Sequence, residues 1–353
     1  MPEQRFEGWV AERSTKEQDL EWKTYDIKPF EETDIEIRIT HCGVCGTDNH
    51  TAHDGWGNTR FPIVVGHEIV GVAIRVGSKA TGDIKVGDIV GVGAQSDACF
   101  EREGPCEQCA NGLENYCHNV VNTYGGRHRC GAPSTGGYAL YHRCPSRFVI
   151  KIPQGLDPEN AAPMLCAGAT VYAPLKHFGA KGRRVAVIGI GGLGHFAIMF
   201  ARALDALEVV AISRTANKKD DAISMGAGEH IATSEKGWAE RNKRRFDLII
   251  STADGPNMQW KEYFSLLRMD GTMVQVGAPE KPIPVDIFSL LPIRGKLTST
   301  QTASPKEMRE MLDLAVEKEL KPWVETRPMS EANEVLKDLQ AGKPRFRYVL
   351  VNV

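Results

Sequence analysis

The chain has 353 residues, 42% of them hydrophobic and 25% charged, which is an ordinary balance for a globular protein with room for two domains. Its 43 basic and 45 acidic residues leave a formal charge of −2, so we expect no nucleic-acid partner. No apolar run is long enough to cross a bilayer and the first ten residues lack an apolar core, so we expect neither a membrane segment nor a signal peptide.

The first part of the chain is predicted to be rich in β-strands. Residues 34–40 alternate apolar and polar side chains as a half-buried strand does, and residues 62–76 and 84–93 are β-branched and punctuated by glycine. Residues 99–137 show little periodicity and predict a long loop region. A loop of that length in a compact domain needs its own reason to be ordered.

From residue 183 the pattern changes to alternating strands and helices, which predicts a parallel sheet covered on both faces. Residues 183–204 predict a buried strand, a glycine turn and an apolar helix. The other expected elements are short apolar strands at 209–213, 247–251 and 272–277, a helix at 305–318 and a last strand at 346–352.

The glycine turn VIGIGGLGH carries Gly189, Gly191 and Gly194 in the spacing G-x-G-x-x-G, with Gly192 and Leu193 between them. The pattern is weak alone, but here it follows a β-branched strand and opens a helix, which is the context of a dinucleotide-binding turn. The helix N-terminus would then offer free N–H groups to the phosphates. The alternative is a glycine-rich turn that binds nothing.

The end of the next strand favours NADP over NAD. An NAD site usually has a carboxylate there for the ribose 2′-hydroxyl, whereas this sequence has Ser213, followed by Arg214 and Lys218. A hydroxyl, a guanidinium and an ammonium suit a 2′-phosphate. The alternative is that the basic residues only face solvent at a helix start, where they would oppose the helix dipole.

Two groups of residues have metal-ligand chemistry. Cys106, Cys109 and Cys117 fall within GPCEQCANGLENYC, without the βαβ pattern that would suggest a redox C-x-x-C. The nine cysteines fit metal binding better than disulfides because we expect a cytoplasmic location, where thiols stay reduced.

The second group is scattered, and its spacing alone is a weak signal. Cys45, His67 and Cys166 make the Cys₂His set of a catalytic zinc, which leaves a fourth position for water or substrate, and Glu68 is a supporting group or an alternative ligand. Buried small apolar side chains are the better interpretation of the remaining cysteines, Cys42, Cys130 and Cys144.

The local sequences around these residues resemble the zinc-containing medium-chain alcohol dehydrogenases. The segments CGVCGTDNH, GHEIVGVAIRVGSKA followed by KVGDIVGVG, PMLCAGATVYAPL and VIGIGGLGH match that superfamily in order. PMLCAGATVYAPLKHFG and SRTANKK resemble its cinnamyl alcohol dehydrogenase-like branch, and the resemblance runs from about residue 5 to the C-terminus.

The resemblance implies an α/β protein with a β-rich, GroES-like catalytic domain and a Rossmann domain with a doubly wound parallel sheet. The catalytic domain is expected over 1–157 and 297–353, with a structural zinc lobe at about 99–120, and the NADP-binding domain over 158–296. Two Zn²⁺ ions per chain, NADP(H) and a homodimer that continues the sheet at an edge near 283–300 are implied as well. The implied activity is reversible hydride transfer between NADPH and aldehydes, aromatic, cinnamyl-type or broad-range.

The resemblance also implies roles for single residues. Cys45, His67 and Cys166 would hold the catalytic zinc, and Glu68 would be able to replace its water or alcohol ligand. Thr47 and His50 would relay the alcohol proton, although Thr47 could instead be a turn residue and His50, like His53, a surface histidine. The remaining implied roles are a hydrogen bond from Asp48 to His67, Thr170 near the nicotinamide, Ser213, Arg214 and Lys218 near the 2′-phosphate, and Arg345 or alternatively Arg347 at a cofactor phosphate.

The family's structural zinc usually has the spacing C-x2-C-x2-C-x7-C, and the last three cysteines match it here. The expected first position is Glu103, so Cys99 becomes the favoured fourth ligand, with an insertion, FEREGP, between it and Cys106. A loop a few residues longer costs little closure entropy. The rivals are Glu103, His118 and Cys130.

Two other functions remain open from the sequence. One is a polyol or amino-alcohol dehydrogenase of the same superfamily, in which relatives often carry a carboxylate where Cys166 stands. The other is a non-enzymatic zinc-binding interaction protein, which would hold one zinc instead of two. Trp56 follows the relay motif closely and could border an apolar substrate pocket or cover a surface.

Overall fold

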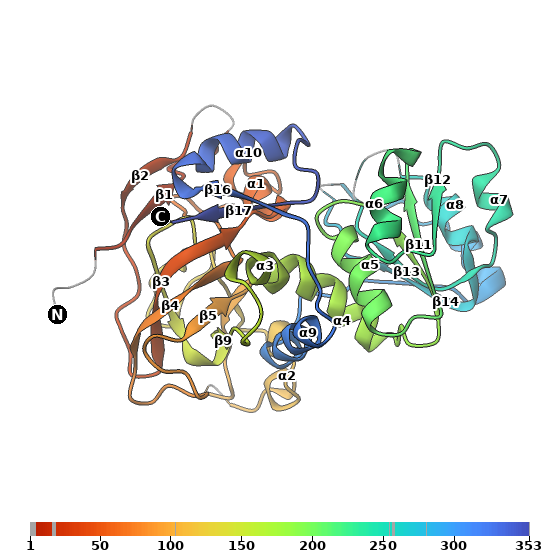
Figure 1. The fold of residues 1–353 in the computed structure, drawn as a ribbon. Helices are drawn as coiled ribbons and strands as arrows, with labels where there is room; N and C mark the ends of the chain where they lie inside the picture. The colour runs from red at the N-terminus through yellow and green to blue at the C-terminus, as the bar shows by residue number, and fades with distance from the viewer. Residues whose placement is uncertain are drawn as a thin grey trace. The chain divides into compact units, whose positions relative to one another are not determined.

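The computed structural model describes residues 5–15, 19–102, 104–253, 255, 258–279 and 281–352. The chain forms two compact units, one of Met1–Cys166 with Ala303–Val353 and one of Ala167–Thr302 (Figure 1). Within the described residues, no helix has both the length and the apolar character needed to span a bilayer.

The first unit is built on a sheet in the order β16-β17-β3-β4-β5-β9, with β8 paired to β3. Two small sheets, β1-β2 and β6-β7, accompany it. Its strands are β1 (Glu7–Val10), β2 (Glu21–Thr24), β3 (Asp34–Gly43), β4 (Ile69–Val76), β5 (Ile89–Val92), β6 (Gln95–Asp97), β7 (Val121–Asn122), β8 (Tyr141–Pro145), β9 (Ile150–Lys151), β16 (Val324–Pro328) and β17 (Arg347–Val351). Its helices are α1 (Gly46–Ala52), α2 (Glu107–Ala110), α3 (Pro158–Pro163), α9 (Pro305–Glu317) and α10 (Ala332–Gln340), the last beside α1 (Figure 1).

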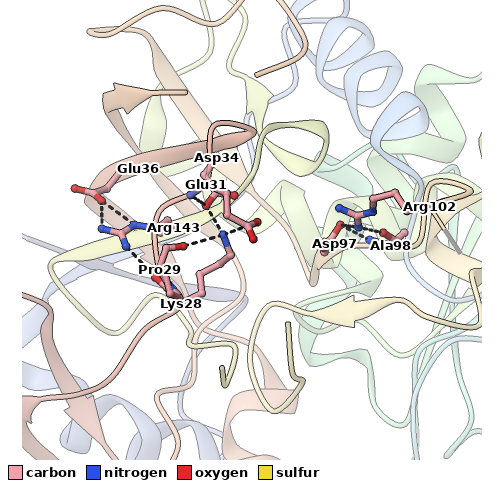
Figure 2. Close-up of polar contacts among 9 residues, drawn as sticks. All are labelled: Lys28, Pro29, Glu31, Asp34, Glu36, Asp97, Ala98, Arg102 and Arg143. Carbon is pink, nitrogen blue, oxygen red and sulfur yellow. Dashed lines mark hydrogen bonds and ion pairs between the residues drawn. The ribbon is translucent and has the colours of Figure 1, made fainter. Parts of the chain in front are cut away.

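The expected strands of this unit are present, and β3 is more deeply buried than its alternating sequence predicts. Ile35, Ile37 and Ile39 are at most 1% exposed, as an inward face should be, but Glu36 is also only 3% exposed. Burial of that carboxylate is tolerated because Arg143 of β8 ion-pairs with it (Figure 2).

A second buried ion pair lies at the start of β3. The ammonium group of Lys28 bonds to the Asp34 carboxylate and also donates to the carbonyl of Pro29 (Figure 2). Arg143 donates in addition to the carbonyl of Lys28 at 2.8 Å. These contacts tie the irregular chain before β3 to the sheet.

The second unit is a doubly wound sheet of six parallel strands in the order β12-β11-β10-β13-β14-β15, as the alternating pattern predicts. Its strands are β10 (Arg184–Ile188), β11 (Glu208–Ser213), β12 (Glu229–Ala232), β13 (Phe246–Ser251), β14 (Leu267–Gln275) and β15 (Lys296–Thr298). Its helices are α4 (Ala169–His177), α5 (Gly194–Ala203), α6 (Lys219–Ser224), α7 (Trp238–Arg241) and α8 (Trp260–Ser265), and α5 lies against β10 and β11 (Figure 1).

The units meet in sequence after Cys166 and after Thr302, whereas the sequence placed the domain limits after residues 157 and 296. The first difference is helix α3, which packs against β3 and β4 and therefore belongs to the first unit. A π-helical turn, Met164–Gly168, follows α3 and carries Cys166.

Candidate active site

One buried group of side chains in the first unit has the geometry of a metal site. The ligand atoms of Cys45, His67, Glu68 and Cys166 all lie within 4.8 Å of one another, and the two sulfur atoms are 4.0 Å apart. Within the described residues, Nε2 of His67 is buried without a hydrogen-bond partner. An orphaned imidazole nitrogen beside two thiols fits zinc, because a bound ion satisfies the nitrogen.

Strand pairing brings these distant residues together. Cys45 is the N-cap of α1, directly after β3, and His67 stands two residues before β4. Because β3 and β4 are antiparallel, with Cys42 opposite Ile69, the end of one strand meets the start of the other. The π-helical turn that presents Cys166 is a form often found at functional sites.

Asp48 supports this group through hydrogen bonds. Its carboxylate accepts N–H bonds from Cys45 at 2.9 Å and Gly66 at 3.1 Å, and the hydroxyl of Tyr138 at 3.2 Å. Within the described residues a hydrogen bond from Asp48 to His67 is not among these contacts, and that role of Asp48 stays a prediction. Asp48 ties together the backbones of the two segments that carry Cys45 and His67.

The charged groups of the site shift one another's pKa. Burial opposes the charged form of His67, but Asp48 and Cys45 raise its pKa to about 9. Burial raises the pKa of Asp48 above its ordinary value. A bound cation would take the place of the proton on the imidazole, so metal binding at this site releases protons.

Glu68 is held by an arginine from the far end of the chain. One terminal nitrogen of Arg347 on β17 contacts both carboxylate oxygens of Glu68, and both side chains are at most 4% exposed. Gly43 leaves the room for this carboxylate, since a Cβ there would lie 1.9 Å from its Oε2. Sequence reasoning named Arg347 only as a rival to Arg345, which is exposed and lies 6.0 Å from the ring centroid of Trp323.

Thr47 and His50 both lie on α1 and are three residues apart, which places them on one face of the helix. Thr47 is half-buried, with its hydroxyl oxygen 3.6 Å from the sulfur of Cys45. The ring of His50 stacks on Trp56 at 4.9 Å between centroids, while His53 bonds through Nδ1 to the Asn49 carbonyl at 2.9 Å. His53 therefore caps the C-terminus of α1.

The cysteine cluster closes into a second candidate metal centre. The ligand atoms of Cys99, Cys106, Cys109 and Cys117 lie within 4.8 Å of one another. Cys99 is 3.7 Å from Cys109 between sulfur atoms, and Cys106 is 3.9 Å from Cys117. Four sulfurs without an open position suit a structural zinc.

Two of the three alternative fourth ligands, His118 and Cys130, can be checked against the structure. In the part of the chain that the structure describes, neither His118 nor Cys130 belongs to this ligand group, and Cys130 is exposed. Glu103 lies outside the described residues.

Arg102 explains how the inserted residues bend back to the cluster. Phe100 and Glu101 both have positive φ, an uncommon conformation that turns the chain sharply. The guanidinium group of Arg102 then donates to the carbonyl of Cys99 at 3.0 Å. It ion-pairs with Asp97 at 2.7 Å (Figure 2). It also bonds to the carbonyl of Ala98. Arg102 is itself one of the inserted residues, so the insertion supplies the contacts that hold it near Cys99. The spacing of the cysteines does not predict these contacts.

In the second unit, the glycine turn has the shape that the motif predicts. Gly189 has φ +89°, and a Cβ at Gly194 would lie 1.8 Å from the carbonyl oxygen of Gly189. A Cβ at Gly191, by contrast, would meet no atom within 4 Å, so that face of the turn is open to a ligand. Leu193 is the N-cap of α5. An open turn before a helix N-terminus fits a dinucleotide pyrophosphate.

The end of β11 gathers polar groups, one of which sequence reasoning missed. The hydroxyl of Ser213 donates to the carbonyl of Thr215 at 2.7 Å and lies 2.9 Å from Nε2 of His230. Lys218 donates to the carbonyl of Ile190 in the glycine turn at 2.9 Å, and the neighbouring Arg214 is exposed. His230 has no local signal, because it stands inside an ordinary short strand. Thr170, half-buried, is the second residue of α4.

Comparison with known proteins gives the family. Residues 31–154 match the model of the alcohol dehydrogenase GroES-like domain, and residues 192–317 match that of the zinc-binding dehydrogenases. The chain is 40% identical to NADP-dependent alcohol dehydrogenase 6 of Saccharomyces cerevisiae, over 99% of this chain and 94% of that protein. It is 38% identical to mannitol dehydrogenase of Apium graveolens, over 97% and 92% of the two chains.

A solved structure agrees with these matches. Cinnamyl alcohol dehydrogenase SbCAD4 of Sorghum bicolor superposes with a TM-score of 0.92 at 32% identity, over 99% of this chain and 98% of that one. Together with the two family models and the sequence relatives, this likeness covers both units. The chain therefore belongs to the zinc-containing medium-chain alcohol dehydrogenases, in their NADP-dependent, cinnamyl alcohol dehydrogenase-like branch.

Proposed function

We propose that this protein reversibly transfers a hydride between NADPH and aldehydes of an aromatic, cinnamyl-type or broad range. The observation that carries the proposal is the buried cluster of Cys45, His67 and Cys166, with the orphaned Nε2 of His67 among its atoms. When bound, zinc polarises the aldehyde oxygen and NADPH supplies the hydride. The first unit contributes the catalytic residues and the second the cofactor site.

Each residue of the group has a distinct part in the proposal. The Cys45 and Cys166 thiolates and the neutral His67 imidazole hold the metal ion. Asp48 fixes the segments that carry Cys45 and His67 relative to each other. Arg347 holds the Glu68 carboxylate, which limits its access to the ion until that contact is released. A cofactor phosphate is a competing partner for Arg347, and Arg345 is the other proposed phosphate contact.

The hydroxyl of Thr47 is proposed to give its proton to the product alkoxide, and His50 to restore it from solvent. The test compares Thr47→Val, which keeps the shape and loses the hydroxyl, with Thr47→Ser, which keeps the hydroxyl. Loss of a proton relay should lower kcat by about 100-fold or more in the valine variant and far less in the serine variant. Equal kcat values in both variants would show that the hydroxyl carries no proton.

The function itself is tested on the metal-loaded protein with aliphatic, benzylic and cinnamyl aldehydes, using NADPH and NADH in parallel. Metal analysis should find two zinc ions per chain, at the two cysteine-containing groups. A protein that holds two zincs and reduces no aldehyde contradicts the proposal, and one zinc per chain would favour an interaction protein.

A polyol dehydrogenase is the second candidate, because mannitol dehydrogenase of Apium graveolens is a close relative. The same assay run in the oxidation direction with mannitol and sorbitol decides between the two. Oxidation of a polyol with a kcat/KM above that of benzyl alcohol would favour this second candidate.

A homodimer through the second unit is also proposed. Strand β15 is an edge of the parallel sheet. Before it in the chain stand apolar side chains with much of their surface exposed, namely Val285, Ile287, Phe288 and Leu291, at 45%, 56%, 76% and 59%. Exposed apolar side chains that precede an edge strand in sequence are consistent with an interface through that edge. Light scattering should report a dimer for the native protein and a monomer for Phe288→Glu. A cytoplasmic location stays a prediction, for which cell fractionation is the check.

A further inference from the structure

His230 lies beside the residue that is proposed to meet the 2′-phosphate of NADP. Strands β11 and β12 are parallel neighbours, with Ala211 opposite His230 and Ser213 opposite Ala232. His230 and Ser213 are thus diagonal neighbours on one face of the sheet, and their side chains are within reach of each other. Nε2 of His230 and the hydroxyl oxygen of Ser213 are 2.9 Å apart.

The direction of this hydrogen bond follows from the serine. A hydroxyl has one proton and two lone pairs, and the proton of Ser213 is directed to the carbonyl of Thr215 at 2.7 Å. The oxygen of Ser213 must therefore accept from His230, so Nε2 of His230 carries a hydrogen. The ring is half-buried, and burial together with Lys219 lowers its pKa, which favours the neutral form.

A phosphate at this position needs the serine proton. Phosphate oxygens only accept, so Ser213 binds one by turning its proton from the Thr215 carbonyl toward the ligand. During that exchange the hydroxyl oxygen keeps its donor, His230, which polarises the O–H bond and strengthens its donation. Lys218 is held near the same place by the carbonyl of Ile190.

We propose that His230 is a positioning residue for NADP specificity, which acts through Ser213 by donating Nε2–H to the serine oxygen. This inference rests on the proposed use of NADP(H). NADH carries a hydroxyl in place of the 2′-phosphate, and a hydroxyl can itself donate to Ser213, so NADH gains little from His230. His230 should therefore affect the binding of the two cofactors unequally, whereas a purely structural residue would affect both alike.

The test compares His230→Gln, whose amide N–H can replace Nε2–H, with His230→Leu, which fills the space without a donor. Dissociation constants for NADPH and NADH are measured by fluorescence titration on the full-length, metal-loaded protein. We expect His230→Leu to bind NADPH about tenfold more weakly with NADH affinity unchanged, and His230→Gln to stay within about threefold of the native protein.

A double variant tests whether His230 influences NADPH binding through Ser213. If His230 acts through Ser213, then His230→Leu combined with Ser213→Ala should bind NADPH no more weakly than Ser213→Ala alone. Should the leucine variant fold poorly by circular dichroism, His230→Asn replaces it, because its shorter amide does not reach the serine.

Unchanged NADPH affinity in the donor-free variant, or an equal loss for NADPH and NADH, would overturn the role of His230. Both results leave the proposed function standing, provided that the native protein prefers NADPH. A native protein that binds NADPH no more tightly than NADH would overturn the proposed cofactor, and this inference with it.

Discussion

Replacing two glycines of the same turn by alanine should have different effects: Gly194→Ala should lower stability, whereas Gly191→Ala should lower only NADPH affinity. A Cβ at Gly194 would lie 1.8 Å from the carbonyl oxygen of Gly189 and 2.9 Å from its carbonyl carbon. These are backbone atoms, so no side-chain rotation relieves the clash, and the start of α5 must retreat by roughly 1.5 Å to regain ordinary contact. Most of α5 is buried against the sheet, so this shift disturbs the core.

The magnitude for Gly194→Ala follows from that geometry. Overpacking in a well-packed core typically costs about 1–3 kcal/mol, and a rigid backbone neighbour places this case at the upper end. A loss of about 3 kcal/mol lowers the folding equilibrium constant by a factor of more than 100. NADPH binding should also weaken, because the N–H groups at the start of α5 move.

Gly191→Ala is the matched control. Its Cβ would meet no atom within 4 Å and its φ is not positive, so stability should stay within about 0.5 kcal/mol of the native protein. The methyl group would occupy the open face of the turn, and NADPH should bind at least about tenfold more weakly.

Urea unfolding with circular dichroism gives the overall stability of both variants, and hydrogen exchange over residues 184–203 gives the local one. NADPH affinity comes from fluorescence titration. A native-like urea midpoint for Gly194→Ala, or a lowered midpoint for Gly191→Ala, would refute this account of the turn.

Three further predictions concern the first unit. Cys99→Ser should lose the zinc of the lobe and part of the thermal stability, with Cys130→Ser as the exposed control, and equal zinc content in the two variants would contradict Cys99 as a ligand. Gly43→Ala should displace the Glu68 carboxylate, from which its Cβ would be 1.9 Å, and lower the urea midpoint, whereas an unchanged midpoint would speak against that close approach. Burial lowers the pKa of His142 to about 3 in the folded protein against 6.5 when unfolded, so its contribution to stability is present above pH 6.5 and is lost as the pH falls toward 3. When the pH falls from 7 to 5, the free energy of unfolding measured in urea should therefore drop by about 2 kcal/mol less for His142→Leu than for the native protein. Equal drops in the two proteins would contradict a buried neutral histidine.

Local sequence was enough to predict a feature when all of its residues are close together in the chain. The β-branched run of β10, the glycines after it and the apolar helix α5 lie within residues 184–203, so the dinucleotide turn could be predicted with its context. Three of the four cysteines of the lobe are similarly close in sequence. The short strands β12 and β15 were not predicted, because four and three residues are too few to show an apolar period. The helix α10 was missed although its buried residues Ala332, Val335 and Leu336 recur at helical spacing.

The tertiary structure decided which distant residues meet. Cys45 and Cys166 are 121 positions apart, and Glu68 and Arg347 are 279 apart. The first contact depends on the packing of α3 against β3 and β4, and the second on the pairing of β17 with β3 and of β3 with β4. No local pattern specifies either arrangement. The same holds for His230 beside Ser213, which requires two parallel strands to be neighbours. Sequence determines the chemistry that each segment carries, because spacing and residue type are local; the order of strands decides which of those groups act together.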